Sequence, residues 1–269
     1  MLSARIVFGI AWDYVKLSFY SRFSTKLYEE PLITIKEQTM PIQDDWNELL
    51  NIREKALSTI KHQTIEEKYL LLLAVRVTEL CIDAITLLEE KRSAALPIIL
   101  RSAIEAYIHL LKILQEPLHI ETMKLSFNYD MHKFLENVKF VNTNEYRDKK
   151  KGPHIKELFN NVSESITYLG LYAHLCMHSH SNISALVTSH SIDGKILLGT
   201  TQNTDFIKLH TLIVVTLFAD TLKDTLNQFN HDRKAIENIE TIIERINNDP
   251  FMVKFHDLKK TDSQGIYEK

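Results

Sequence analysis

Glycine and proline are scarce in this chain, with six of each among 269 residues. Because these residues mark turns and end helices, their scarcity excludes a fold of many short strands and tight turns. It favours long helices joined by few loops. Apolar residues make up 45% and charged residues 25% of the chain, which is ordinary for a globular protein and excludes extensive disorder.

Cysteine and long apolar runs are also rare. Cys81 and Cys176 are the only cysteines, and each lies in an apolar segment, as expected of reduced, buried thiols in a cytoplasmic protein. No apolar run approaches the ~20 residues that span a bilayer, so we expect no membrane association. Asp13 and Lys16 interrupt the apolar N-terminus, which we interpret as a helix and not as a signal peptide.

The formal net charge of −3 excludes a global basic field that would steer the molecule to nucleic acid. A local basic patch remains compatible with this charge. The run from Arg147 to Lys151 is the clearest example. Such a run is usually a solvated loop, and a contact with a phosphate backbone is the alternative.

Apolar periodicity predicts an all-α fold, a single bundle of about seven to nine helices. Asp193-Gly194, between two short alternating arms, predicts one small β-hairpin near 187–199. We divide the chain into an N-terminal helix and linker (1–41), a helical-bundle domain (42–248) and a C-terminal tail (249–269). Thr64 and Glu67 match a capping box at the start of the most apolar helix, which we expect at the centre.

The chain is organised around the apolar stretch 96–114, which carries Arg101 and Glu105. Four residues apart on a helix, these two side chains lie on one face. One interpretation is a partly exposed ion pair without further consequence. The other is an arginine that points into a cleft and is held by the glutamate, an arrangement suited to binding a phosphate or a carboxylate.

A second stretch, 172–182, is expected to meet the first and contains His174, His178 and His180. His174 and His178 share a helical face, so a metal site completed by Glu105 is one option. Acid–base chemistry is another, and histidines that only form structural hydrogen bonds are a third. No carboxylate-rich ligand pattern accompanies them, so we expect no metal and no other cofactor.

Both stretches resemble motifs of a widespread, uncharacterised bacterial family, a domain of unknown function found in standalone and defence-island proteins. LRSAIEAYIHLLKIL resembles its L-R-S-x-x-E-x-Y helix, and LCMHSHSN resembles its later L-S-x-x-x-H-P-S motif. Cys176 stands in place of the usual serine, and Ser181 in place of the usual proline. The resemblance covers about residues 65 to 230. Arg101, Glu105 and Tyr107 match its first motif, and His180 with Ser181 or Asn182 matches its second. We expect catalytic roles for Arg101, Glu105 and His180, and binding roles for Tyr107, Ser181, Asn182 and the neighbouring His178.

That family is similar in plan to the HEPN superfamily, many members of which are metal-independent ribonucleases that dimerise to pair R-x4–6-H motifs. Arg147 and His154 have this spacing, but the intervening DKKKGP is typical of a loop, so we interpret the match as coincidence. We expect instead that Arg101 and His180 meet in space. His180 would transfer a proton at the ribose 2′-hydroxyl, and Arg101 would stabilise the developing phosphorane charge.

The resulting hypothesis is a HEPN-like, metal-independent ribonuclease or toxin in antiphage defence that acts on RNA. The main alternative is a non-enzymatic helical module that binds a partner protein or a small anionic ligand. A metal-dependent hydrolase using His174, His178 and Glu105 is a third and less favoured reading. We also expect a homodimer, because the aromatic first helix and the apolar last helices offer more apolar surface than one bundle hides.

Overall fold

The computed structural model describes residues 40–90, 92–138, 150–159, 166–179, 191–192, 195–196, 204–250 and 252. The predicted first helix and most of the tail lie outside this part of the chain. Within it, the helices are α3 (Met40–Thr59), α4 (Ile65–Glu89), the 3-10 helix η1 (Ser93–Ala95), α5 (Leu96–Gln115), α6 (His119–Asn137), α7 (Ile155–Phe159), α8 (Ile166–Ser179), α10 (Thr204–Gln228) and α11 (Arg233–Asn247). The described residues are therefore predominantly helical, as predicted.

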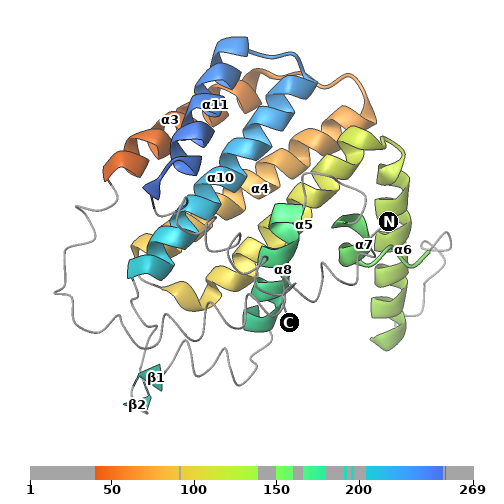
Figure 1. Cartoon of the computed structure of the whole chain (residues 1–269). Coiled ribbons are helices and arrows are strands. Elements are labelled where there is room, and N and C mark those ends of the chain that lie inside the picture. The colour runs from red at the N-terminus through yellow and green to blue at the C-terminus, as the bar shows by residue number, and fades with distance from the viewer. Residues whose placement is uncertain are drawn as a thin grey trace, which may run out of the picture.

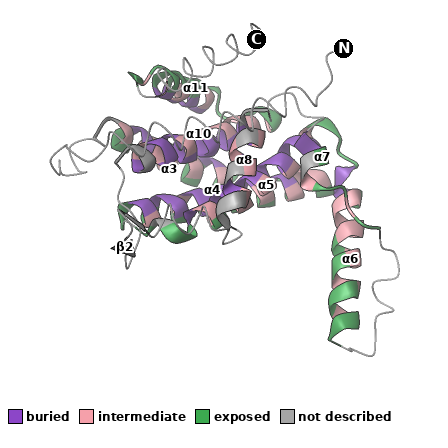
Figure 2. Cartoon of the chain, turned by 60° about the horizontal axis from the view of Figure 1, so that its bottom comes forward, coloured by how far each residue is buried: buried purple, intermediate pink, exposed green. Residues whose placement is uncertain are grey.

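Helices α4, α5 and α10 form the centre of the bundle (Figure 1). Helix α4 packs against both α5 and α10, which confirms the central position predicted for the most apolar helix. Helices α3 and α11 cover one side of α10, and α7 and α8 lie against α5. Helix α6 projects away from the bundle (Figure 2). Buried apolar side chains, among them Leu100, Ile104 and Phe218, form one continuous core.

The start of α4 shows how local sequence sets a helix boundary. The side chain of Thr64 accepts a hydrogen bond from the backbone N–H of Glu67 at 3.2 Å. The carboxylate of Glu67 accepts one in return from the backbone N–H of Thr64 at 3.3 Å. This reciprocal pair is the predicted capping box, and it satisfies two N–H groups that have no partner inside the helix.

Helix α5 presents one apolar and one polar face, and this asymmetry positions the candidate site. Pro97 lies in its first turn, where a missing N–H removes no helical hydrogen bond. Leu100, Ile104 and Ile108 are buried against the core. The polar face carries the arginine and glutamate singled out from the sequence and turns towards α6, α7 and α8.

The described part of the segment 187–199 contains two strands of two residues each. Ser191–Ile192 (β1) pairs antiparallel with Lys195–Ile196 (β2), so that Ser191 lies opposite Ile196. The alternating arms predicted on either side of this pair lie outside the described residues. The architecture is therefore that of a helical bundle.

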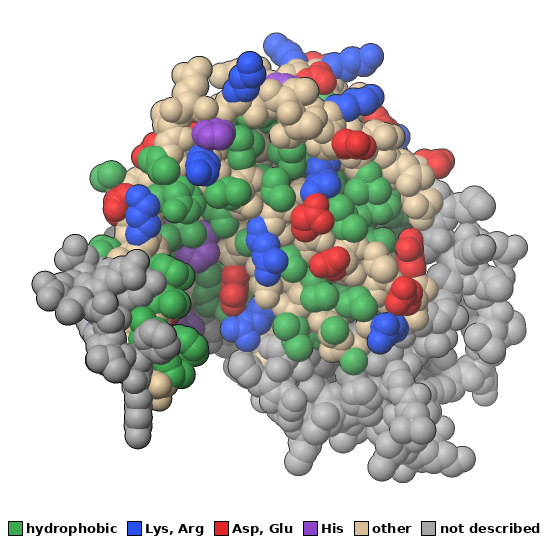
Figure 3. All heavy atoms as spheres, turned by 180° about the vertical axis from the view of Figure 1, so that it is seen from behind, with side chains coloured by type: hydrophobic (Ala, Val, Ile, Leu, Met, Phe, Trp, Pro, Cys, Tyr) green, Lys and Arg blue, Asp and Glu red, His purple; other side chains and the backbone are tan. Residues whose placement is uncertain are grey.

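The apolar surface is not where the sequence placed it. Ile239, Ile242 and Ile246 of α11 are buried inside the chain, so the expectation that this last helix offers an exposed apolar face is wrong. The reason is that α11 docks on α10 and α3. On α6, by contrast, Phe127 is 56% and Phe134 is 58% exposed. Apolar side chains are also mixed with charged ones over the face shown in Figure 3, where histidines line a hollow.

Candidate functional site

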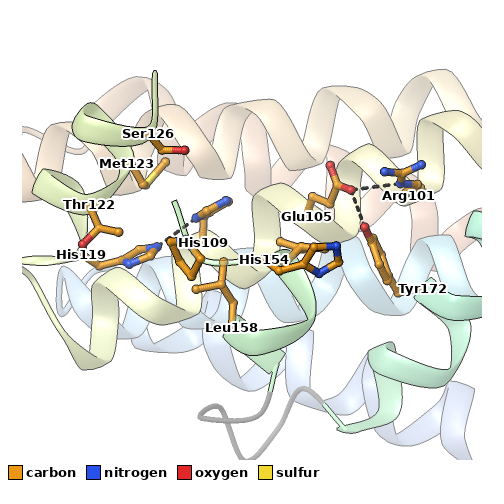
Figure 4. Close-up of a pocket in the computed structure, with 12 residues that line it drawn as sticks. Arg101, Glu105, His109, His119, Thr122, Met123, Ser126, His154, Leu158 and Tyr172 are labelled. Atoms are coloured by element: carbon orange, nitrogen blue, oxygen red, sulfur yellow. Dashed lines mark hydrogen bonds and ion pairs between the residues drawn. The ribbon is translucent and has the colours of Figure 1, made fainter. Parts of the chain in front are cut away.

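A pocket of about 240 Å³ opens on the polar face of α5. Arg101, Glu105 and His109 follow one another along α5 at intervals of four residues, so all three line the same side of the pocket. The opposite wall comes from α6, from the segment that leads into α7, and from α8 (Figure 4). Four consecutive elements of the chain therefore meet around one cavity.

At one end of the pocket, the side chains of Arg101 and Tyr172 both donate a hydrogen bond to the same carboxylate oxygen of Glu105. Nε of Arg101 donates to Oε1 of Glu105 at 3.0 Å. The hydroxyl of Tyr172 on α8 donates to the same oxygen at 2.8 Å. The guanidinium carbon of Arg101 also lies 5.6 Å from the centroid of the Tyr172 ring, within range of a cation–π contact.

This network holds Arg101 in place and keeps it charged. The Arg101 and Glu105 side chains are 29% and 33% exposed, so the pair is neither fully solvated nor sealed in the core. Burial alone would lower the pKa of Arg101, but the hydrogen bonds to Glu105 and Tyr172 raise it overall. Arg101 and Glu105 thus form the partly exposed ion pair of the first interpretation, and Tyr172 adds a hydrogen bond to the same carboxylate from α8.

The other end of the pocket is formed by two imidazoles. Nδ1 of His109 lies 2.9 Å from Nε2 of His119, the first residue of α6, so one ring donates a hydrogen bond to the other. The rings are stacked, with centroids 5.2 Å apart and planes inclined by 21°. Burial lowers the pKa of His109 to about 4. Burial, followed by the positive charge of Lys112, also lowers the pKa of His119.

The remaining wall depends on a close approach between two segments. Thr122, Met123 and Ser126 line the pocket from α6, and Pro153 and His154 line it from the opposite segment. Gly152 lies so close to α6 that a Cβ at this position would overlap Oγ of Ser126 and lie 2.8 Å from its Cβ. The absence of a side chain at Gly152 therefore lets the segment carrying His154 reach the pocket.

Chemically, the lining combines one guanidinium, one carboxylate and three imidazoles. A guanidinium held by a carboxylate binds phosphate or carboxylate groups well, because its donors are already oriented. Imidazoles that are neutral near pH 7 can accept a proton. The pocket is therefore suited to an anionic ligand and to proton transfer.

The structure places some of the predicted site residues in the pocket and others elsewhere. Arg101 and Glu105 come together in the pocket, and the predicted meeting of the two stretches is confirmed by the contact of Tyr172 with Glu105. Tyr107 points away from the pocket. Its side chain is 2% exposed and its hydroxyl donates to Asp224 of α10 at 2.8 Å, which indicates a structural role in place of the predicted binding role.

The side chains of the predicted site residues in the second stretch, 172–182, lie outside the described part of the chain. His180, Ser181 and Asn182 lie outside the described residues. His174 and His178 belong to α8, but their side chains lie outside the described part. The predicted meeting of Arg101 and His180 therefore stays a prediction. Within the described residues, no three metal-binding side chains are grouped so as to hold a metal ion.

The pocket residues not assigned to the site from the sequence include three histidines and a tyrosine: His109, His119, His154 and Tyr172. His109 had a usable signal, because it continues the spacing of Arg101 and Glu105 by another four residues. His119 had none, because its contact with His109 requires the turn between α5 and α6. His154 was interpreted as part of a coincidental motif, yet it lines the pocket.

Residues 67–196 match the model of a family described as a family of unknown function (DUF5677). Over these residues, which are just under half of the chain, the protein is similar to that family. The matched residues contain every side chain that lines the pocket, and the predicted resemblance to an uncharacterised family is confirmed. Neither the curated proteins nor the solved structures yield a match. No helix in the described part of the protein has the length and apolar character needed to cross a membrane.

Proposed function

We propose that this protein is a HEPN-like ribonuclease that binds RNA at the Arg101 pocket and cleaves it without a metal ion. The observation that carries the proposal is the position of the Arg101 guanidinium, held by Glu105 in a pocket that it shares with His109, His119 and His154. A guanidinium and imidazoles in one cavity are the groups that phosphodiester cleavage at a ribose 2′-hydroxyl requires.

In the proposed reaction, Arg101 binds the scissile phosphate. A neutral imidazole accepts the proton of the 2′-hydroxyl as its oxygen attacks phosphorus, and a protonated imidazole donates a proton to the leaving 5′-oxygen. The products are a 2′,3′-cyclic phosphate and a 5′-hydroxyl, so no net proton is consumed. We assign the proton transfers to His180, on the resemblance, and to His154, because its imidazole lines the pocket.

The approach to the pocket supports an RNA ligand. Lys150 and Lys151 are exposed and directly precede the segment that carries His154. The backbone N–H of Lys150 donates to the carbonyl of Leu125 on α6 at 3.3 Å, which holds this basic segment beside the pocket. Its charges are available to neighbouring phosphates of a bound strand, although the chain as a whole is slightly acidic.

The test is cleavage of total RNA and tRNA by purified protein, with and without a chelator. Cleavage is expected to persist with the chelator and to fall at least a hundredfold in Arg101→Ala and His180→Ala, the usual scale for removing a transition-state contact or an acid–base group. Arg233→Ala is a matched control, because Arg233 also pairs with a glutamate four residues on, at 3.3 Å, but on the surface of α11. Full activity in Arg101→Ala contradicts the proposal.

The second candidate is a non-enzymatic module that binds a small anion or a partner protein. The observation that favours it is that Oε1 of Glu105 is shared by two donors, an arrangement that positions Arg101 without providing proton transfer. It predicts anion binding that depends on Arg101 together with no RNA cleavage in any variant.

We further propose that the protein acts in antiphage defence as a homodimer, with the exposed part of α6 at the interface. Phe127, Phe134 and Val138 are large apolar side chains that the described chain leaves in solvent. Light scattering at micromolar concentration is expected to show a dimer for the wild type and a monomer for Phe127→Glu/Phe134→Glu. A wild-type monomer contradicts this part of the proposal.

A further inference from the structure

The charged side chains at the two ends of the pocket are paired with opposite charges, and the exposed Lys150 and Lys151 lie only at its approach. The positive charge of Arg101 is offset by Glu105, with which it is paired at 3.0 Å. Behind His119, the positive charge of Lys112 is offset in the same way by Glu116, also at 3.0 Å. With His109 and His119 both neutral, a doubly charged anion in this cavity would be poorly compensated. The pocket therefore needs an additional positive charge when such a ligand enters.

We infer that the His109–His119 pair is an anion subsite that takes up one proton when a doubly charged phosphate or sulfate group enters the pocket. In the empty pocket the pair holds two ring protons, one of which forms the bond between the rings. A third proton leaves that bond in place and makes both outer ring nitrogens donors. Figure 4 shows the outer edge of the His109 ring turned away from His119, towards the Glu105 end of the pocket.

The electrostatic environment explains why the proton is absent before the ligand binds. Burial and the neighbouring His119 lower the pKa of His109, whereas Glu105 raises it. The net result is a pKa of about 4. Burial and Lys112 lower the pKa of His119, and Glu116 opposes them. His154 faces the same cavity from the α7 side, and Arg101 lies at its far end. The pair is thus neutral at pH 7, and a negative charge placed beside it would raise its pKa.

The charge of the ligand is large enough to protonate the histidine pair at neutral pH. A unit charge at about 4 Å, in an environment with an effective dielectric constant of about 20, changes a pKa by about 3. A doubly charged group beside the pair is therefore able to raise the pKa of His109 from about 4 to near or above 7. A singly charged phosphodiester has half this effect. The subsite accordingly selects a phosphate monoester over a diester.

This inference rests on the proposed anion pocket but not on RNA cleavage. For a ribonuclease, the corresponding ligand is an RNA strand that ends in a phosphate monoester. For a binding module, it is a small molecule with a terminal phosphate. Loss of cleavage and loss of proton uptake are measured separately, so either can fail while the other stands.

The test is calorimetric titration of the full chain with sulfate, which stays doubly charged across the range used, in two buffers of different ionisation enthalpy. About one proton is expected to be taken up per sulfate near pH 7, and affinity is expected to rise up to tenfold for each pH unit from 7.5 down to 5.5. Dimethyl phosphate, which carries one charge, is expected to bind more weakly and to take up only about half a proton near pH 7. His109→Gln keeps a hydrogen-bonding side chain but is expected to abolish the uptake.

His132→Gln is the control, because His132 lies further along α6, pairs with Glu136 and does not line the pocket. Proton uptake that persists in His109→Gln, or that disappears in His154→Gln alone, overturns the inference. So does sulfate binding without proton uptake, or no binding at millimolar sulfate. If His109→Gln fails to fold, NMR of the wild type decides: the ring signals of His109 and His119 must titrate at higher pH with sulfate than without it.

Discussion

The guanidinium carbon of Arg101 lies 5.6 Å from the ring centroid of Tyr172, and both side chains hydrogen-bond to one oxygen of Glu105. Tyr172 therefore contributes in two ways, through its hydroxyl and through its ring. These two contributions are separable by mutation, because phenylalanine keeps the ring and leucine keeps neither.

Tyr172→Phe is expected to weaken sulfate binding by about 3- to 10-fold, since one hydrogen bond of about 1 kcal/mol no longer orients Glu105 and hence Arg101. Tyr172→Leu is expected to weaken it further. Tyr168→Phe is the matched control, because Tyr168 donates to Asp220 at the same distance of 2.8 Å but outside the pocket. Calorimetry measures affinity and thermal unfolding measures stability. Equal loss of affinity in Tyr168→Phe would show that Tyr172 acts only on stability.

Gly152→Ala is expected to displace the segment carrying His154, because the new Cβ overlaps Oγ of Ser126. We expect this variant to lose sulfate affinity, or RNA cleavage, by about tenfold or more, as displacement of a site residue by 1 Å costs up to about a hundredfold. Ser126→Gly in the same chain removes the obstructing atoms and is expected to restore most of the loss. A double variant as defective as Gly152→Ala alone would place the cause elsewhere.

Stability is expected to fall in acid because of His109. The pKa of His109 is about 4 in the folded chain, below the value of about 6.5 for a free histidine. Below pH 6.5 the unfolded chain therefore binds a proton that the folded chain does not. Stability is full above pH 6.5 and declines towards pH 4, by at most about 1.4 kcal/mol per pH unit from this group.

Urea unfolding between pH 4 and 7.5 measures this decline. His109→Gln is expected to flatten it, whereas His132→Gln is expected to leave it in place. An unchanged pH dependence in His109→Gln would contradict a neutral, buried His109. This measurement needs no ligand, so it tests the resting state of the pair by itself.

Lys112→Met is expected to raise the pKa of His119. Lys112 is buried beside this histidine and is one of the causes that lower its pKa, and methionine replaces it with an apolar side chain of similar length. An NMR titration of the His119 ring measures the change. Lys208→Met is the control, because Lys208 pairs with Asp249 away from the pocket. A His119 titration that does not move in Lys112→Met would contradict the electrostatic account of the pair.

Several features of the fold were predictable because they depend on residues close together in the chain. The capping box of Thr64 and Glu67 and the shared face of Arg101 and Glu105 follow from spacings of three or four residues. Such spacings map directly onto helix geometry. The central position of α4 followed from the width of its apolar face.

Other features were not predictable, because they depend on how helices dock. The hydroxyl of Tyr107 and that of Tyr172 both donate to carboxylates, yet Tyr107 does so in the core and Tyr172 does so at the pocket. Nothing in the local sequence distinguishes these surroundings. The burial of the α11 isoleucines and the exposure of Phe134 on α6 likewise depend on how the helices dock.

By itself, the sequence determined the helices, their order and the polar face of α5, because helix periodicity and capping are local. Tertiary structure alone decided which imidazoles share the cavity with Arg101. The turn after α5 brings His119 onto His109, and the missing side chain of Gly152 lets the segment of His154 close against α6. These contacts join residues from different elements, and packing, which has no period in the sequence, is what brings them together.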